Sequence, residues 1–133
     1  MEKILVITDD TDAARYFADE VARYFENSPS LRYHVSIVDA AGFSGTDLLP
    51  VFAFLIGCEL PNAFAPYYIS DFFNHINLAG RPCGIFSPNR EALKYLAGML
   101  KPSEAAIGNP FIFKNGAIEE KELAKWVDGI LLP

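Results

Sequence analysis

At 133 residues the chain has the length of one domain, and we expect residues 1–133 to fold as a single unit. Its composition, 51% hydrophobic and 21% charged, is that of a globular protein, and no apolar run approaches the ~20 residues that cross a bilayer. A net charge of −6 with scattered basic residues argues against nucleic acid and membrane as partners. Two cysteines are too few for a disulfide framework, so a reducing, cytoplasmic location fits best.

The first predicted element is a strand. Residues 3–8 form a short aliphatic run, which is typical of a strand buried on both faces. A helix follows, because Ala13, Phe17 and Val21 repeat every four residues and give one apolar stripe. The segment 9–12 between them is rich in aspartate and threonine, so it supplies a turn and an N-cap for that helix.

Strands and helices continue to alternate in the middle of the chain. We expect the next two strands at 33–39 and 51–57 because both segments are rich in β-branched and aromatic residues. A loop at 58–68 then leads to a helix, for which Ser70 or Asp71 is the expected N-cap.

The same alternation continues to the last helix. The fourth strand is expected at 82–86, and the helix after it ends before Pro102. A fifth strand lies within 104–113 and is interrupted at 108–110, and a last helix carries Leu123 and its apolar neighbours at helical spacing. This order of elements implies right-handed crossovers and a mostly parallel sheet that is covered on both faces.

Ligands of such sheets bind beyond the carboxyl ends of the strands, at the topological switch point. Three loops follow strands at that edge, namely 9–13, 58–68 and 87–90. We expect these three loops to meet in one crevice.

Two motifs in the middle of the chain resemble those of the flavodoxin family at the family's spacing. An acidic-Leu-Leu lead at 47–49 runs into the apolar strand at 53–57. Asp-Phe-Phe at 71–73 and the stretch 76–82 resemble the family's next helix and its entry into the fourth strand. The resemblance covers nearly the whole chain, and it implies a three-layer α/β sandwich with a five-stranded parallel sheet in the order 2-1-3-4-5 and helices on both faces.

The resemblance further implies that the three loops hold flavin mononucleotide (FMN) for electron transfer to a redox partner protein. Thr8, Thr11 and nearby amides would receive the phosphate, and an aromatic residue of the second loop would flank the ring. No catalytic or metal-binding residue is expected, since the cofactor does the redox chemistry. The residues expected to line this site are Thr8, Asp9, Asp10, Thr11, Asp12, Ala13, Cys58, Glu59, Leu60, Pro61, Phe64, Tyr67, Tyr68, Ser87, Pro88 and Asn89.

The first loop departs from the family's pattern. It matches that pattern only in Thr8 and Thr11 and contains no glycine, although phosphate binding relies on backbone N–H groups at a helix N-terminus. Each of its aspartates repels a phosphate by roughly 2 kcal/mol at ~6–8 Å. The helix dipole stabilises a bound phosphate by only ~0.3–1 kcal/mol, or ~2 kcal/mol at best. Repulsion therefore exceeds attraction unless the carboxylates turn outward.

The other two loops depart as well. Pro61 stands where the family commonly places an aromatic residue against the flavin ring. Phe64, Tyr67 or Tyr68 could replace it, because an aromatic face stacks on a flat ring, but we expect at least one of them to pack beneath the loop. In the third loop Pro88 removes a backbone N–H that could bond to a flavin edge.

Other chemistries are possible at the same residues. The pair Asp9 and Asp10 also resembles the metal-binding pair of response-regulator receiver domains, and carboxylates can hold Mg²⁺ or Ca²⁺. Phosphotransfer is not expected, because Gly57 stands where the phosphoacceptor aspartate is required, and helix capping is the simpler interpretation of the acidic loop. Cys58 is the candidate nucleophile, but the neighbouring Glu59 disfavours a thiolate, so we expect a buried structural cysteine.

Two functions stay open. The first is an FMN-linked electron carrier. The second is a degenerate flavodoxin-fold domain that binds no flavin and serves as a ligand-binding or protein-interaction module, since fold does not fix function. The aromatic stretch 62–68 has the composition of interface anchors. In both cases we expect a carrier or binding domain rather than a catalyst with its own active-site residues.

Overall fold

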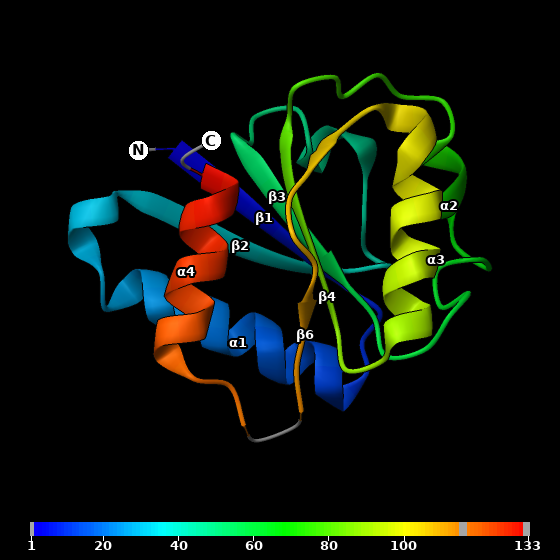
Figure 1. The fold of residues 1–133 in the computed structure, drawn as a ribbon. Coiled ribbons are helices and arrows are strands. Elements are labelled where there is room, and N and C mark those ends of the chain that lie inside the picture. Colours follow the sequence, from blue (N-terminus) through cyan, green and yellow to red (C-terminus); the bar gives the residue numbers. More distant parts are fainter. Residues whose placement is uncertain (1, 115–116, 132–133) are drawn as a thin grey trace.

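The computed structural model describes residues 2–114 and 117–131. A parallel β-sheet forms its middle layer (Figure 1). The strands lie in the order β2-β1-β3-β4-β5, with β6 also paired to β4, so the predicted order 2-1-3-4-5 is confirmed. The strands are β1 (Glu2–Thr8), β2 (Tyr33–Asp39), β3 (Ala53–Gly57), β4 (Pro82–Ser87), β5 (Ala106–Ile107) and β6 (Phe111–Ile112).

Helices cover both faces of the sheet, which confirms the predicted α/β sandwich (Figure 1). One face carries α1 and α4, and the other carries α2 and α3. The helices are α1 (Asp12–Glu26), α2 (Tyr68–Phe73), α3 (Arg90–Leu100) and α4 (Glu120–Leu131), with short 3₁₀ turns at Pro29–Leu31, Gly45–Asp47 and Lys101–Ser103. Within the described residues, no helix is both long and apolar enough to cross a membrane.

The two faces have separate apolar cores because side chains alternate along each strand. Along β1, Ile4 and Val6 pack beneath α1 and α4, whereas Leu5 and Ile7 pack beneath α2 and α3. All five residues of β3 are buried, as expected for a central strand that is covered on both sides. This burial explains why the sequence showed uninterrupted apolar runs at these strands.

Two predicted boundaries need correction, and the predicted interruption of the fifth strand is confirmed. The third strand begins at Ala53 and not at residue 51. The N-cap of α2 is Tyr67, with no side-chain hydrogen bond, so the prediction of Ser70 or Asp71 was wrong. The interrupted fifth strand is two short strands: β5 pairs with the start of β4 and β6 with its end, on either side of the predicted break at 108–110.

The register of the sheet brings the three predicted loops to one edge. Thr8 is paired with Gly57, and Gly57 with Phe86, so β1, β3 and β4 end side by side. The segments that follow residues 8, 57 and 86 therefore leave the sheet as neighbours. This is the arrangement on which the site prediction depends.

Candidate functional site

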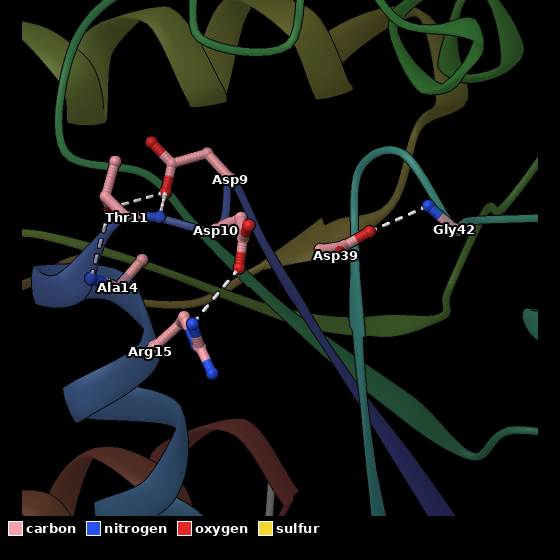
Figure 2. A network of polar contacts seen from close by, with 7 residues as sticks. All are labelled: Asp9, Asp10, Thr11, Ala14, Arg15, Asp39 and Gly42. Atoms are coloured by element: carbon pink, nitrogen blue, oxygen red, sulfur yellow. Dashed lines mark hydrogen bonds and ion pairs between the residues drawn. The ribbon is translucent and has the colours of Figure 1, made fainter.

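We call one part of this edge the inner corner. It consists of the ends of β1 and β3 together with residues 9–12 and 58–60. Asp9 joins its two loops. One oxygen of the Asp9 carboxylate accepts hydrogen bonds from the Thr11 hydroxyl at 2.7 Å and from the Thr11 backbone N–H at 3.3 Å (Figure 2). The other oxygen accepts from the backbone N–H of Glu59 at 3.0 Å. A single carboxylate thus receives three donors, one of which comes from a residue 50 positions away.

The other two aspartates of this loop point outward. Asp10 has a left-handed backbone (φ 66°), and its carboxylate lies 3.5 Å from the Arg15 guanidinium, with both side chains 62% exposed (Figure 2). Asp12 is exposed in the first turn of α1. The hydroxyl of Thr11 accepts from the Ala14 N–H at 3.3 Å and so caps the helix. The predicted capping role of the loop is confirmed, and Thr11 is the residue that performs it.

These contacts test whether the inner corner suits a phosphate. A phosphate cradle needs backbone N–H and hydroxyl donors that are free to face the ligand. Here the donors of Thr11 and Glu59 face the Asp9 carboxylate. A phosphate would have to displace that carboxylate and then stay within a few ångströms of its charge, a repulsion of roughly 2–3 kcal/mol. The residues present do not fit an FMN phosphate at this position.

The end of β3 is closely packed. A Cβ atom added to Gly57 would lie 2.1 Å from the Phe86 ring, so only glycine fits there. Thr8, Ala13 and Cys58, three of the predicted site residues, are buried around the same point. Their side chains therefore offer almost no surface to a ligand.

The second loop places its aromatic residues unequally. Phe64 is 0% exposed, and its backbone N–H donates to the Tyr95 hydroxyl at 3.1 Å, so the prediction that it could flank a ring needs correction. Its apolar ring belongs to the core, as we expected for at least one residue of the three. Tyr68 is 58% exposed but packs against Phe43 and Phe72, over α2 and away from the inner corner.

Three of the predicted residues in the second loop are exposed and are left as possible ligand contacts. Tyr67 is 38% exposed and lines a shallow hollow between α2 and α3. Leu60 is 59% exposed, and Pro61 beside it is exposed as well. Leu60 directly follows Glu59, whose backbone N–H donates to Asp9, so an exposed apolar side chain follows the Asp9 bridge in the chain.

Burial controls the chemistry of Cys58. Desolvation, with a smaller contribution from the negative charge of Asp9, raises the pKa of its thiol to about 12. Burial also raises the pKa of the neighbouring Tyr95 hydroxyl. Both groups are therefore protonated at neutral pH. Cys58 has neither the exposure nor the thiolate character of a nucleophile, which agrees with the structural role expected for it.

In the third loop the polar side chains bond within the chain. Ser87 is fully buried, and its hydroxyl accepts from the Asn89 N–H at 3.0 Å. Asn89 in turn accepts from the Glu91 N–H at 2.9 Å and caps α3. Pro88 and Arg90, at the end of this loop, line a hollow together with residues of β6.

That hollow, which we call the outer hollow, has a volume of about 380 Å³. It lies at the carboxyl end of β6, next to the starts of α3 and α4. The residues that line it are Pro88, Arg90, Phe111, Ile112, Phe113, Lys114, Ala117 and Glu122. Of these, only Pro88 was among the predicted site residues; Arg90 belongs to the predicted third loop at 87–90, and the other residues come from segments outside the three predicted loops.

The acidic pair does not form part of a larger metal-binding group. Among residues 2–114 and 117–131, no three His, Cys, Asp or Glu side chains could together hold a metal ion. Asp9 is committed to Thr11 and Glu59, and Asp10 to Arg15. Gly57 ends β3, where a receiver domain would need its phosphoacceptor.

Comparison with known proteins reveals similar structures but no matching sequence family. No protein-family model matches the sequence, and no curated protein matches it significantly. Among solved structures, a flavodoxin of Streptococcus pneumoniae TIGR4 superposes with a TM-score of 0.74 at 16% identity, covering 98% of this chain and 97% of that one. A short-chain flavodoxin associated with a bacterial microcompartment gives 0.72 at 14% identity, with coverage of 98% and 97%.

A third solved structure, flavodoxin 2 of Bacillus cereus, gives a TM-score of 0.65 at 18% identity and covers 91% of both chains. Together with the strand order, these likenesses define the class: the protein has a flavodoxin-like fold. Identities this low bear on the fold alone. The chemistry of the site must be argued from the residues of this chain.

Proposed function

We propose that this protein is a flavodoxin-fold binding or interaction domain that does not hold FMN through a phosphate cradle in its first loop. The observation that carries this proposal is the Asp9 bridge, because its carboxylate takes up the Thr11 and Glu59 donors that a phosphate would use. The burial of Phe64 supports it, since one of the three possible ring-stacking residues lies in the core. The cytoplasmic location and the single domain over residues 1–133 stay predictions.

FMN titration tests the proposal directly. We expect the purified protein to be colourless and to quench the fluorescence of added FMN only weakly. The variant Asp9→Ser with Asp10→Ser frees the donors and removes two charges, so its affinity for FMN should rise by about tenfold or more, equivalent to ~1.4 kcal/mol.

A second double variant, Asp10→Ser with Asp12→Ser, is the matched control. It removes the same charge but keeps the Asp9 bridge, so its gain in affinity should be much smaller. Equal gains in both variants would show that general repulsion, and not the bridge, keeps FMN out. A wild-type protein that purifies yellow and retains FMN through gel filtration would refute the proposal.

FMN-linked electron transfer is the second candidate, and the likeness to solved flavodoxins favours it. In that case Leu60 or Tyr67 would be the exposed side chains beside the ring, because Phe64 is buried. Wild-type binding of FMN, lost in Leu60→Asp and kept in Tyr68→Ser, would select this candidate over the first.

A further inference from the structure

The outer hollow has the dimensions and lining of a site for a small molecule. Its volume of about 380 Å³ lies in the range of ~300–1,000 Å³ that is typical of ligand pockets. Its apolar part comes from three successive residues, Phe111, Ile112 and Phe113. The two phenylalanines are buried in the core, whereas Ile112 is 44% exposed. A ligand that covered Ile112 would gain the hydrophobic stabilisation that the chain alone does not supply.

The charge of the hollow is opposite to that of the whole protein. Arg90 and Lys114 line it from two sides, with Glu122 as the one acidic lining residue, while the chain carries a net charge of −6. Within the part of the chain that the structure describes, neither cation forms an ion pair. Arg90 is also the first residue of α3, so the positive end of the helix dipole lies on the same side. These features favour an anionic group.

The strand edge beside the hollow provides a backbone donor. Phe113 donates its N–H to the Ser87 carbonyl at 3.3 Å, so it faces β4. Because successive residues of a strand direct their backbone groups to opposite sides, Ile112 directs its N–H away from β4, to the outer edge of the sheet. A carboxylate seated between the two cations would therefore also have a main-chain donor within its reach.

We propose that the outer hollow binds a small amphipathic anion, a molecule with an apolar body and a carboxylate or similar acidic head. The body would lie on Ile112 and the phenylalanines, and the head would lie between Arg90 and Lys114. This site is separate from the inner corner, so the proposal does not depend on whether FMN binds there.

Two fluorescent probes of similar shape test the proposal. Anilinonaphthalene sulfonate carries a negative charge, and phenylnaphthylamine carries none. Wild-type protein should bind the sulfonate more tightly than the uncharged probe, and decanoate should compete with both. In Arg90→Gln with Lys114→Gln, affinity for the sulfonate should fall by about tenfold, whereas affinity for the uncharged probe should change less than about twofold. Ile112→Gln should weaken both probes.

The control variant is Lys3→Gln with Lys101→Gln, which removes the same charge from exposed positions outside the hollow. An equal loss of sulfonate binding in this control would overturn the proposal, because it would show an effect of net charge alone. Unchanged binding in the Arg90 and Lys114 variant would overturn it too. A two-dimensional NMR amide spectrum of wild-type protein titrated with decanoate needs no variant: shifts centred on 111–114 would support the site, and shifts centred elsewhere would reject it.

Discussion

The inner corner and the outer hollow lie at the same edge of one sheet, but the polar groups of the two sites differ in whether they have partners within the chain. In the inner corner the donors of Thr11 and Glu59 bond to the chain's own Asp9. In the outer hollow Arg90 and Lys114 are exposed to solvent, and Phe111, Ile112 and Phe113 form the apolar part of the lining. The sheet topology predisposes the whole edge to bind ligands. Which part of the edge is available depends on single side chains.

This contrast shows why the fold alone does not determine the site. Solved flavodoxins share the path of this chain over more than nine-tenths of its length. The Asp9 carboxylate carries both the charge and the hydrogen-bond acceptors of an anion, so it would compete with a phosphate for the donors of the first loop.

The largest effect is expected at Gly57, the best-packed point of the inner corner. In Gly57→Ala the new Cβ would lie 2.1 Å from the Phe86 ring, which is itself stacked on Phe17 at 4.3 Å. Overpacking of this kind should lower the free energy of unfolding by about 3 kcal/mol in urea denaturation. Gly98→Ala in α3 is the control, since nothing lies within 4 Å of its Cβ, and it should raise stability by ~0.5–1 kcal/mol. A much smaller loss of stability in Gly57→Ala would mean that the side chains around Gly57 can move to accommodate the new methyl group.

The next largest effect separates Asp9 from Asp10. Asp9→Ala removes three hydrogen bonds to a charged acceptor and leaves the Glu59 N–H without its partner, so we expect a loss of about 2 kcal/mol. Asp10→Asn keeps a residue that tolerates the left-handed backbone at this position and removes only an ion pair in which both side chains are 62% exposed, so it should change stability by less than ~0.5 kcal/mol. Urea denaturation of both variants measures the difference. Equal effects would show that the Asp9 bridge contributes nothing specific.

The sequence predicted the fold well because the relevant signals are local. The aliphatic run at 3–8 and the four-residue repeat from Ala13 identify β1 and α1 without any tertiary information. The start of α2 was predicted wrongly because Tyr67 caps nothing through its side chain, so the position carries no sequence signal. The break at 108–110 was visible as Gly-Asn-Pro and separates β5 from β6 as expected.

The site was harder to predict because its contacts are long-range. The sequence indicated that the acidic loop would repel a phosphate, but not that Asp9 would turn inward while Asp10 turned outward. The bond from Glu59 to Asp9 spans 50 residues, and the bond from Phe64 to Tyr95 spans 31. Neither has a local pattern. Arg90 and Lys114 likewise meet only because β6 pairs with the end of β4.

An effect that depends on pH tests the burial of Cys58. Its thiol has a pKa of about 12 in the fold and 9.0 without the fold's influence. The folded state therefore holds a proton that the unfolded state releases, so the stability from this group is complete below pH ~9 and is lost as pH rises toward about 12. Over that window Cys58 lowers the free energy of unfolding by ~1.4 kcal/mol per pH unit. Burial raises the pKa of the Cys83 thiol too, so Cys58→Ala should lower the slope in urea titrations above pH ~9 by ~1.4 kcal/mol per pH unit and leave the part that Cys83 contributes; an unchanged slope would contradict the assignment.

The smallest effect is expected at Ile112, in the outer hollow. Ile112→Ser exchanges a side chain that is 44% exposed on an edge strand, so little burial is lost and stability should fall by only ~0.5–1 kcal/mol. Ile37→Ser on β2, the opposite edge strand, is a close match because Ile37 is 43% exposed, and the two losses should agree. A loss well above that of Ile37→Ser would mean that Ile112 belongs to the core. The floor of the hollow would then be closed to a ligand, and the contrast with the inner corner would disappear.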